Sequence, residues 1–310
     1  MLEATNVAVE FGRARAVDGV NLSIAPGEIV ALVGESGCGK TTLARTLLGL
    51  ERPASGTVSY NGRPLNYSGR ALRAFRRQVQ LVLQDPTGSL NPRHTVYEAV
   101  AEGPRIHGLP DEEAVVTSAL ARAGLRPPER FFLRYPHELS GGQRQRVVIA
   151  GALALNPKIL IADEPVASLD ASIRGEILAL LLRLRDDLGL GALVVTHDLG
   201  LAWNIADRVA VMYLGRIVES GPTEDVLTNP QHPYTQALLS VLPESPARII
   251  LTGEPPDPTH IPSGCRFHPR CQVVASGNGI DACHATLLPI LPAAAESQVA
   301  CHVVPVSSIS

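Results

Sequence analysis

The chain has 310 residues, of which 45% are hydrophobic and 18% charged, and its formal net charge is −3. This length predicts about two domains, and the apolar content excludes an intrinsically disordered chain. The slightly acidic balance argues against a general nucleic-acid-binding protein, so we expect no nucleic acid among its partners.

The sequence carries no segment that predicts insertion into a membrane. No uninterrupted apolar stretch reaches the roughly 18 residues that a membrane-spanning helix needs. The N-terminal residues lack a basic segment followed by an apolar one, so no signal peptide is predicted. We therefore expect the chain to stay in the cytoplasm, where it can still dock on a membrane protein.

The N-terminal segment reads as strands followed by a glycine-rich loop. Apolar residues alternate with polar or small ones over 7–11 and again over 20–24, which predicts half-buried strands. Residues 29–33 form a continuous apolar run typical of a strand buried on both faces, and 41–50 predict a helix. A strand, a glycine loop and a helix in this order begin an α/β nucleotide-binding fold.

The remaining chain alternates between helical and strand patterns up to a change in composition. Residues 92–150 predict mostly helices and turns. The later elements predicted are helices over 111–124 and 172–188, strands over 158–162 and 192–196, and a hairpin over 208–213 and 216–219. Seven prolines between 243 and 269 interrupt any period, so we place a domain boundary near 245 and a small cysteine-bearing module after it.

The glycine loop fits the phosphate-binding pattern G-x-x-x-x-G-K-[ST] from Gly34 to Thr41. Glycines let backbone N–H groups turn toward phosphate oxygens, and the helix that follows presents its positive N-terminus. Lys40 can reach the β- and γ-phosphates, and the Thr41 hydroxyl can bind Mg²⁺. The predicted nucleotide-binding residues are Gly34, Ser36, Gly37, Cys38, Gly39, Lys40, Thr41 and Thr42, with Cys38 as a small loop residue and not a catalyst.

Two further segments have the chemistry of a nucleotide site. Asp163 and Glu164 end an apolar strand, where Asp163 can hold Mg²⁺ and Glu164 can orient or deprotonate the attacking water. Ser140 is a good N-cap for a helix that starts within Ser140, Gly141, Gly142 and Gln143, so this segment is a candidate anion site. Alone, the first could be a solvated strand end and the second a plain capped helix.

Taken together, these three segments resemble the ATP-binding subunit of an ABC transporter. Gln84 matches that family's Q-loop, and Ser168-Leu169-Asp170 matches its D-loop. His197 matches the switch histidine, and Phe11 matches the aromatic residue that stacks on adenine. The sequence departs from the pattern only slightly, for example at Gly151, where arginine is common. Glycine inside a helix costs about 1 kcal/mol relative to alanine.

The resemblance implies a P-loop ABC-type ATPase of the α/β class. Its RecA-like core would carry an antiparallel β subdomain and a helical subdomain at about 92–150, with the ATP-binding domain over 1–245 and the cysteine module over 246–310. Two ATPase subunits, identical or homologous, would form a head-to-tail dimer. Each ATP would lie between one phosphate loop and the partner's Ser140–Gln143 segment, with Ser140 and Gly142 contacting the γ-phosphate.

The same resemblance implies roles for the remaining site residues. Glu164 would act on water, His197 would steady the γ-phosphate, and Gln84 would sense it. Thr41, Gln84 and Asp163 would bind Mg²⁺. A binding module that holds ATP without turnover is the less favoured alternative, because Lys40, Asp163, Glu164 and His197 are all present.

Segments outside the ATPase core narrow the resemblance to the oligopeptide, dipeptide and nickel importer branch. These segments are 232–239 and 264–271, together with 135–138 before Leu139. We expect an ATPase subunit that drives peptide uptake with two membrane permeases and, indirectly, an extracytoplasmic binding protein. It would lie peripherally on the cytoplasmic face of the membrane. Nickel or another small solute is the nearest alternative, and a soluble ABC protein of translation or DNA repair is a distant one.

Four of the five cysteines lie in the C-terminal segment with the spacing C-x5-C-x11-C-x17-C, at Cys265, Cys271, Cys283 and Cys301. Four thiolates suit a [4Fe–4S] cluster or a structural zinc ion. His268, His284 and His302 lie near them in the sequence and could replace a cysteine as zinc ligands. The resemblance implies an iron–sulfur cluster in some family members, while disulfides or free thiols stay possible.

Overall fold

The structure is a computed structural model that describes residues 1–167, 169–242, 248–294 and 296–304. The chain divides into two compact units. The first unit contains Met1–Ser23, Val30–Leu65 and Thr196–Ser310, and the second contains Ile24–Ile29 and Asn66–Val195. The boundary predicted near 245 lies outside the described residues, as does Ser168 of the predicted D-loop.

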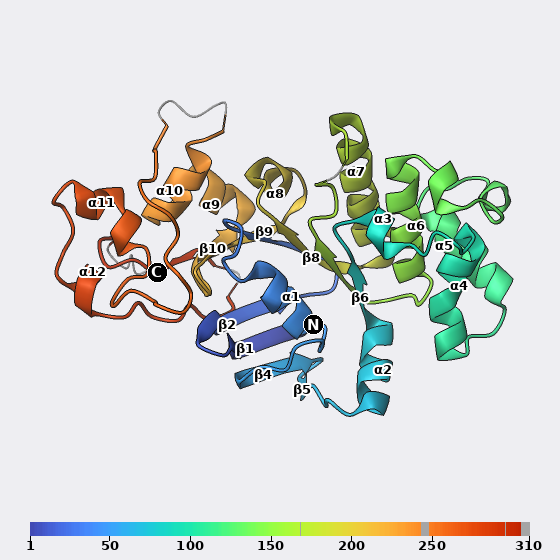
Figure 1. The fold of residues 1–310 in the computed structure, drawn as a ribbon, viewed down its shortest axis with the longest axis horizontal. Helices are drawn as coiled ribbons and strands as arrows, with labels where there is room; N and C mark the ends of the chain where they lie inside the picture. Colours follow the sequence, from blue (N-terminus) through green and yellow to red (C-terminus); the bar gives the residue numbers. More distant parts are fainter. Residues whose placement is uncertain (168, 243–247, 295, 305–310) are drawn as a thin grey trace. The chain divides into compact units, whose positions relative to one another are not determined.

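The first unit begins with an antiparallel sheet whose strand order is β2-β1-β4-β5 (Figure 1). Its strands are β1 (Leu2–Phe11), β2 (Ala14–Ile24), β4 (Ser55–Tyr60) and β5 (Arg63–Pro64). Both predicted strands are confirmed. In β2 the buried residues alternate from Val20 to Ile24, whereas in β1 the register shifts between Thr5 and Ala8 and residues 7–9 are all buried. The sequence analysis missed β4, since Val58 is its one buried residue and a single apolar side chain makes no pattern.

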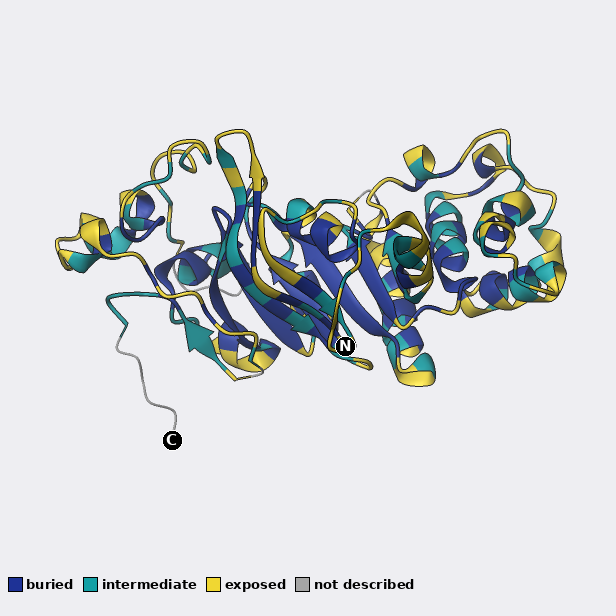
Figure 2. Ribbon diagram, turned by 90° about the horizontal axis from the view of Figure 1, so that it is seen from below, coloured by how far each residue is buried: buried dark blue, intermediate teal, exposed yellow. Residues whose placement is uncertain are grey.

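A second group of strands in the first unit has the order β11-β10-β9-β3. All five residues of β3 (Ile29–Val33) are buried, as predicted, and β3 runs parallel to β9 (Arg208–Tyr213). The predicted hairpin is formed by β9 and β10 (Arg216–Pro222), and β10 also pairs with the short β11 (Gln298–Val299). Figure 2 shows the central strands largely in the buried colour, in line with the burial of β3, β9 and most of β10. Helix α1 (Lys40–Leu47) follows β3 after the glycine loop.

The described C-terminal residues pack within this first unit. The helices of this part are α8 (Leu199–Ile205), α9 (Thr223–Thr228), α10 (Pro233–Leu239), α11 (Gln272–Ala275) and α12 (Ala282–Ala285). Helices α11 and α12 have only four residues each, which is why the sequence shows no period after residue 243. An aromatic cluster holds this segment on β9. The ring centroids of Tyr213, Tyr234 and Phe267 lie 4.6–5.4 Å apart, and all three residues are buried.

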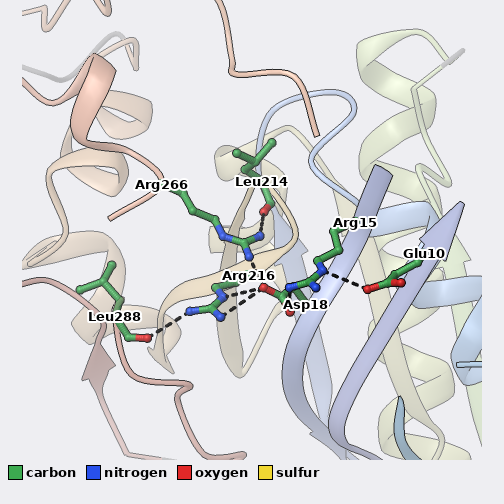
Figure 3. Close-up of polar contacts among 7 residues, drawn as sticks. All are labelled: Glu10, Arg15, Asp18, Leu214, Arg216, Arg266 and Leu288. Carbon is green, nitrogen blue, oxygen red and sulfur yellow. Dashed lines mark hydrogen bonds and ion pairs between the residues drawn. The ribbon is translucent and has the colours of Figure 1, made fainter. Parts of the chain in front are cut away.

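Asp18 in β2 joins arginines from distant parts of the first unit (Figure 3). Arg216 donates to Asp18 Oδ2 at 3.1 Å, and Arg266 donates to the same oxygen and to the carbonyl oxygen of Leu214. Burial lowers the pKa of Arg266 to about 10, while the carboxylate of Asp18 acts in the opposite direction. These bonds fasten the C-terminal segment to the N-terminal sheet.

The second unit contains three parallel strands in the order β8-β7-β6. They are β6 (Val79–Val82), β7 (Ile159–Asp163) and β8 (Gly191–Thr196). The two longer strands confirm the predicted buried strands to within one residue at either end. The sequence analysis missed β6, because four residues are too few for a recognisable period.

Helices make up the rest of the second unit, and α4, α5 and α6 pack on one another. They are α2 (Gly69–Gln78), α3 (Pro86–Ser89), α4 (Val96–His107), α5 (Glu112–Arg122), α6 (Gly141–Leu153) and α7 (Ala171–Leu188). The helices predicted over 111–124 and 172–188 correspond to α5 and α7. Helix α2 was not predicted, and Phe75 is its one buried residue. Within the described residues, no helix combines the length and apolarity required to cross a bilayer.

Candidate functional site

The glycine loop joins the buried strand β3 to helix α1, and two of its glycines have no room for a side chain. Gly34 has φ 154° and Gly39 has φ 108°. A Cβ atom on Gly34 would lie 2.2 Å from the carbonyl oxygen of Met212, and one on Gly39 would lie 2.1 Å from that of Ala16. Glycine is therefore required at both ends of the loop, for conformation and for space.

Lys40 is buried at the first position of α1, and its ammonium group turns back over the loop. Its Nζ donates to the carbonyl oxygens of Gly34 and Glu35, each at 2.8 Å. Gly39 is the N-cap of α1, and no side chain within the described residues caps this helix. The helix start thus keeps its N–H groups clear of side-chain acceptors, as an anion site requires.

The other predicted loop residues differ in exposure. Ser36, Gly37 and Thr41 are exposed, while Thr42 is partly exposed. Cys38 is buried, and burial raises the pKa of its thiol, although Lys40 lowers it. Burial thus favours the neutral thiol of Cys38 over the nucleophilic thiolate.

Two further predicted residues of the first unit lie at the ends of strands. Phe11 ends β1, and its side chain is 51% exposed, which leaves a ring face open to a planar ligand. His197 directly follows β8 and is exposed. The next residue, Asp198, accepts a hydrogen bond from the backbone N–H of Leu201 at 3.1 Å and so begins α8.

In the second unit, the acidic pair lies at the carboxyl end of β7. Asp163 is the last residue of the strand. Glu164 has φ 46°, a left-handed conformation that is uncommon for a residue with a side chain, and its N–H donates to the carbonyl oxygen of Val195 at 2.9 Å. Gln84 Nε2 donates to Glu164 Oε2 at 3.3 Å. The fold thus brings two predicted site residues, 80 positions apart in the chain, into contact and holds one in an unusual conformation typical of functional sites.

The start of α6 is a reciprocal capping box. Ser140 Oγ accepts from the N–H of Gln143 at 3.2 Å, and Gln143 Oε1 accepts from the N–H of Ser140 at 3.0 Å. Ser140 is exposed and is the N-cap, as predicted. A Cβ atom on Gly142 would approach Ile173 of α7 to 2.6 Å, so this glycine is needed for helix packing. Gly141 is partly exposed.

The predicted residues therefore fall into two sets, each within one unit. The first unit holds Phe11, the loop from Gly34 to Thr42, and His197. The second unit holds Gln84, Ser140–Gln143, Asp163 and Glu164.

The sequence analysis missed two contacts made by the glycine loop. Arg270 pairs with Glu35, and the Tyr234 hydroxyl accepts a hydrogen bond from the Glu35 N–H. The available signals were a carboxylate inside a phosphate-binding pattern and the arginine of the 264–271 segment.

The four C-terminal cysteines all belong to the first unit. Cys265, Cys271 and Cys283 are buried, Cys301 is partly buried, and all are free thiols. The N–H of Cys265 donates to the carbonyl oxygen of Cys283 at 2.9 Å. Burial raises the pKa of the Cys265 thiol to about 11, and the other three thiols contribute in the same direction. Across residues 1–167, 169–242, 248–294 and 296–304, however, no group of three or more His, Cys, Asp or Glu side chains has an arrangement that could hold a metal ion.

The histidines near these cysteines have partners of their own. His268 Nδ1 lies 2.9 Å from the carbonyl oxygen of Cys265, and the His268 and His284 rings stack edge to face with centroids 4.7 Å apart. His302 Nε2 lies 2.7 Å from the carbonyl oxygen of Thr286. His268 and His302 thus each have one ring nitrogen at a backbone oxygen, which leaves the other as the possible ligand atom.

Comparison with known families and proteins supports this arrangement of segments. The family profile described as "ABC transporter" matches residues 17–167, and the one described as "Oligopeptide/dipeptide transporter, C-terminal region" matches residues 218–277. The chain is 43% identical over 305 residues to the oligopeptide transport ATP-binding protein AppF of Bacillus subtilis, covering 94% of this chain and 91% of that protein. It is 46% identical over 266 residues to the dipeptide transport ATP-binding protein DppF of Haemophilus influenzae, covering 83% and 81%.

A solved structure with a similar fold is the ATP-binding cassette MJ0796, a dimer in a post-hydrolysis state bound to ADP and Pi. It matches with a TM-score of 0.64 and 32% sequence identity, over 72% of this chain and 99% of that chain. The likeness therefore extends from the sequence to the fold of the region that carries the predicted nucleotide site.

Proposed function

The chain belongs to the ABC transporter family, in the branch with the oligopeptide/dipeptide C-terminal region, and from this premise we propose that it is the ATP-hydrolysing subunit of a peptide importer. The observation that carries the proposal is the uncapped start of α1, where Lys40 is buried over a glycine loop. Lys40 would bind the β- and γ-phosphates, and the loop N–H groups would cradle the phosphate oxygens. Exposed Phe11 would stack on the adenine ring.

Mg²⁺ would be bound by Thr41, Gln84 and Asp163, whose hydroxyl, amide and carboxylate oxygens are the donors that this hard cation prefers. When bound, Mg²⁺ neutralises charge that develops on the transferring phosphoryl group. The protein's own part is to position the reactants. Glu164 would accept a proton from the attacking water, Gln84 would orient Glu164 and sense the γ-phosphate, and His197 would hold that phosphate in place.

A second ATPase subunit, identical or homologous, would complete the site in a head-to-tail dimer. The exposed Ser140 and the backbone of Gly141, Gly142 and Gln143 would contact the γ-phosphate held by the partner's loop. Both the dimeric cassette MJ0796 with ADP and Pi and the exposure of Ser140 support this proposal. ATP would then join the two subunits, and loss of the γ-phosphate would release them.

Two membrane permease subunits would dock on a groove of the second unit and hold the chain peripherally at the cytoplasmic face of the membrane. The groove is lined by residues of β6, α3, α4 and α6. Leu83 and Ile106 in its wall are exposed large hydrophobic residues, at 45% and 53%, which a partner can cover. Leu83 precedes Gln84, so the segment that carries this nucleotide-sensing side chain would face the permeases and pass its motion to them. An extracytoplasmic binding protein would deliver the peptide to the permeases.

Peptides are the cargo that the relatives' names support, over nickel or another small solute. The ATP-binding domain would span 1–245, with its helical subdomain at about 92–150, and the C-terminal extension would span 246–310.

The extension would use Cys265, Cys271, Cys283 and Cys301 to hold a [4Fe–4S] cluster, with Zn²⁺ as the alternative. The C-x5-C-x11-C-x17-C spacing and the hydrogen bond from the Cys265 N–H to the Cys283 carbonyl oxygen support this proposal. The described residues form no ready metal-holding group, so the thiols would have to rearrange and lose their protons on binding.

A Glu164→Gln variant tests the ATPase proposal. We expect ATP-dependent dimerisation to persist and hydrolysis to fall by about 100-fold or more, because a general base contributes that much. Glu113→Gln, which changes an exposed carboxylate of α5, is the matched control and should hydrolyse ATP at the wild-type rate. Unchanged hydrolysis in Glu164→Gln would remove Glu164 from its role. Reconstitution with the cognate permeases, followed by ATP-dependent uptake of labelled dipeptides and of nickel, tests the cargo.

The metal proposal has a separate test. Anaerobically purified protein should absorb at about 400 nm, as iron–sulfur proteins do, and should lose this absorbance in a Cys265→Ser/Cys271→Ser variant. The control variant Cys38→Ser changes the fifth cysteine, which lies outside the proposed cluster, and should retain the absorbance. Colourless wild-type protein that contains zinc would exclude the iron–sulfur assignment.

A further inference from the structure

The phosphate loop contains a carboxylate that works against its function. Glu35 directly follows Gly34, and its backbone carbonyl oxygen accepts a hydrogen bond from Lys40. ATP carries several negative charges, so an uncompensated carboxylate in the loop would repel the nucleotide and compete with it for Lys40. A loop of this sequence therefore needs a cation to neutralise Glu35.

The structure supplies that cation from the C-terminal segment, 235 positions along the chain. Arg270 Nη1 donates to Glu35 Oε2 at 2.7 Å, and Arg270 Nη2 donates to Glu35 Oε1 at 3.1 Å. The Arg270 side chain is 7% exposed and that of Glu35 is 26% exposed. The two parallel bonds neutralise the carboxylate and also fix its orientation. A lysine ammonium group would neutralise the charge but would not fix the orientation in this way.

A second contact fixes the backbone at the same place. The Glu35 N–H donates to the hydroxyl of Tyr234 at 2.9 Å, and Lys40 Nζ donates to the Gly34 carbonyl oxygen at 2.8 Å. These two groups belong to one peptide unit, which is thus held at both ends. Tyr234 is fully buried and packs against Phe267, three residues before Arg270.

The short segment that carries Arg270 is held in place by further hydrogen bonds within the first unit. Arg270 ends a short 3-10 turn, His268–Arg270, between Cys265 and Cys271. Before this turn, Arg266 donates to Asp18 and to the Leu214 carbonyl oxygen (Figure 3).

The residue after Leu214 continues the connection to the loop. The N–H of Gly215 donates to the carbonyl oxygen of Cys38 at 2.8 Å. The C-terminal segment therefore reaches the phosphate loop by two routes, one through Arg270 and one through Arg266.

We propose that Arg270 is a positioning residue for ATP binding: it neutralises and orients Glu35, so that the C-terminal segment sets the affinity of the phosphate loop for nucleotide. This inference rests on the proposed ATPase function. It assigns the extension a direct effect on the nucleotide site, in addition to any metal that its cysteines hold.

An Arg270→Gln variant of the full chain, assembled with its permeases, tests the proposal. We expect the KM for ATP to rise about tenfold with kcat changed less than about twofold, because the loss acts on nucleotide binding and not on the chemical step. In a Glu35→Gln background, where no repelling carboxylate exists, the same Arg270→Gln change should alter KM by less than about twofold. A merely structural role for Arg270 would not depend on the charge at position 35.

Arg266→Gln is the matched control, since Arg266 is equally buried but pairs with Asp18. Its effect on KM should be the same whether position 35 carries glutamate or glutamine. If Arg270→Gln does not yield folded protein, Arg270→Lys, which keeps the charge and loses the paired geometry, should raise KM by a smaller factor, as long as its melting temperature matches wild type.

An unchanged KM in Arg270→Gln, or an equal rise with either residue at position 35, would overturn the inference. Wild-type protein that neither binds nor hydrolyses ATP would instead refute the proposed function, so the two failures are distinguishable.

Discussion

Two glycine-rich helix starts lie in different units of this protein and are completed in opposite ways. At the start of α1, Gly39 is the N-cap and offers no side-chain acceptor to the first helical N–H groups. At the start of α6, Ser140 and Gln143 satisfy each other's backbone N–H groups in a capping box. The first start is open to a ligand and the second is satisfied by its own sequence.

The difference shows that a helix start needs external support when its own residues do not cap it. The loop before α1 is held by Lys40, by Tyr234 of α10 and by Arg270, which lies in the proposed C-terminal extension. The segment before α6 needs only its local residues. An anion site at a helix start thus combines two features. No side chain caps the first N–H groups, and residues distant in the sequence fix the loop backbone.

The largest expected effect comes from removing the ammonium group at the start of α1. Lys40→Ala should lower ATP affinity and hydrolysis by about 100-fold or more, since the loop loses the cation that faces the phosphates. Lys158→Ala is the matched control, because Lys158 is the only other lysine and is exposed. Equal nucleotide binding by the two variants, measured by titration calorimetry, would contradict the role of α1.

The start of α10 adds a third case to the comparison, because its N-cap residue is His232, whose side chain can bind a proton. Buried His232 Nδ1 accepts from the Tyr234 N–H at 3.0 Å, and burial lowers the pKa of His232 from 6.5 to about 3. As the pH falls below 6.5, the unfolded chain binds a proton that the folded chain does not. The free energy of unfolding should therefore decrease by up to about 1.4 kcal/mol per pH unit until the folded pKa is reached.

His232→Asn isolates this effect, because asparagine can still accept the cap hydrogen bond but does not titrate. The pKa of nearby Glu219 is raised by burial and acts with the opposite sign, but Glu219 is present in both proteins. Chemical denaturation between pH 7 and pH 4 should show that the free energy of unfolding falls less steeply with decreasing pH in the variant than in the wild type. The two slopes should differ by at most about 1.4 kcal/mol per pH unit. Parallel curves would mean that His232 does not contribute.

Replacing the local cap of α6 should have a smaller effect on stability. Ser140→Ala should cost about 1 kcal/mol of unfolding free energy, as the loss of a serine N-cap usually does. Thr95→Ala removes the same kind of cap from α4, whose capping box pairs Thr95 with Glu98, and should cost a similar amount. The rate of ATP hydrolysis distinguishes the two variants, because it should fall in Ser140→Ala and stay unchanged in Thr95→Ala. An equal fall in both variants would mean that Ser140 acts only as a helix cap.

The smallest effect is expected near the other end of α6. Gly151 lies inside this helix, and a Cβ atom there would meet only the carbonyl oxygen of Ala99, at 3.9 Å. Gly151→Ala should therefore raise the free energy of unfolding by about 0.5–1 kcal/mol, because alanine loses less backbone entropy. Gly142→Ala in the same helix should instead destabilise the protein, since its Cβ would approach Ile173 to 2.6 Å. Thermal melts of the two variants should shift in opposite directions.

The local elements of the nucleotide site were predictable because their patterns are short and contiguous. Five consecutive apolar residues predicted β3, and the glycine spacing predicted the loop that follows it. Ser140 and Gln143 predicted a capped helix start. By contrast, α2 was missed because Phe75 is its one buried residue, and β6 was missed because it has only four residues.

The sequence by itself determined the phosphate loop, the acidic strand end and the capped start of α6, because each depends on neighbours within a few positions. Only the tertiary structure decided that Gln84 meets Glu164 and that Arg270 neutralises Glu35, since these pairs are 80 and 235 positions apart. A carboxylate and an arginine are common residues, and no local pattern indicates which charge will lie beside which. That choice follows from the packing of buried strands and aromatic side chains, which fixes where distant segments of the chain meet.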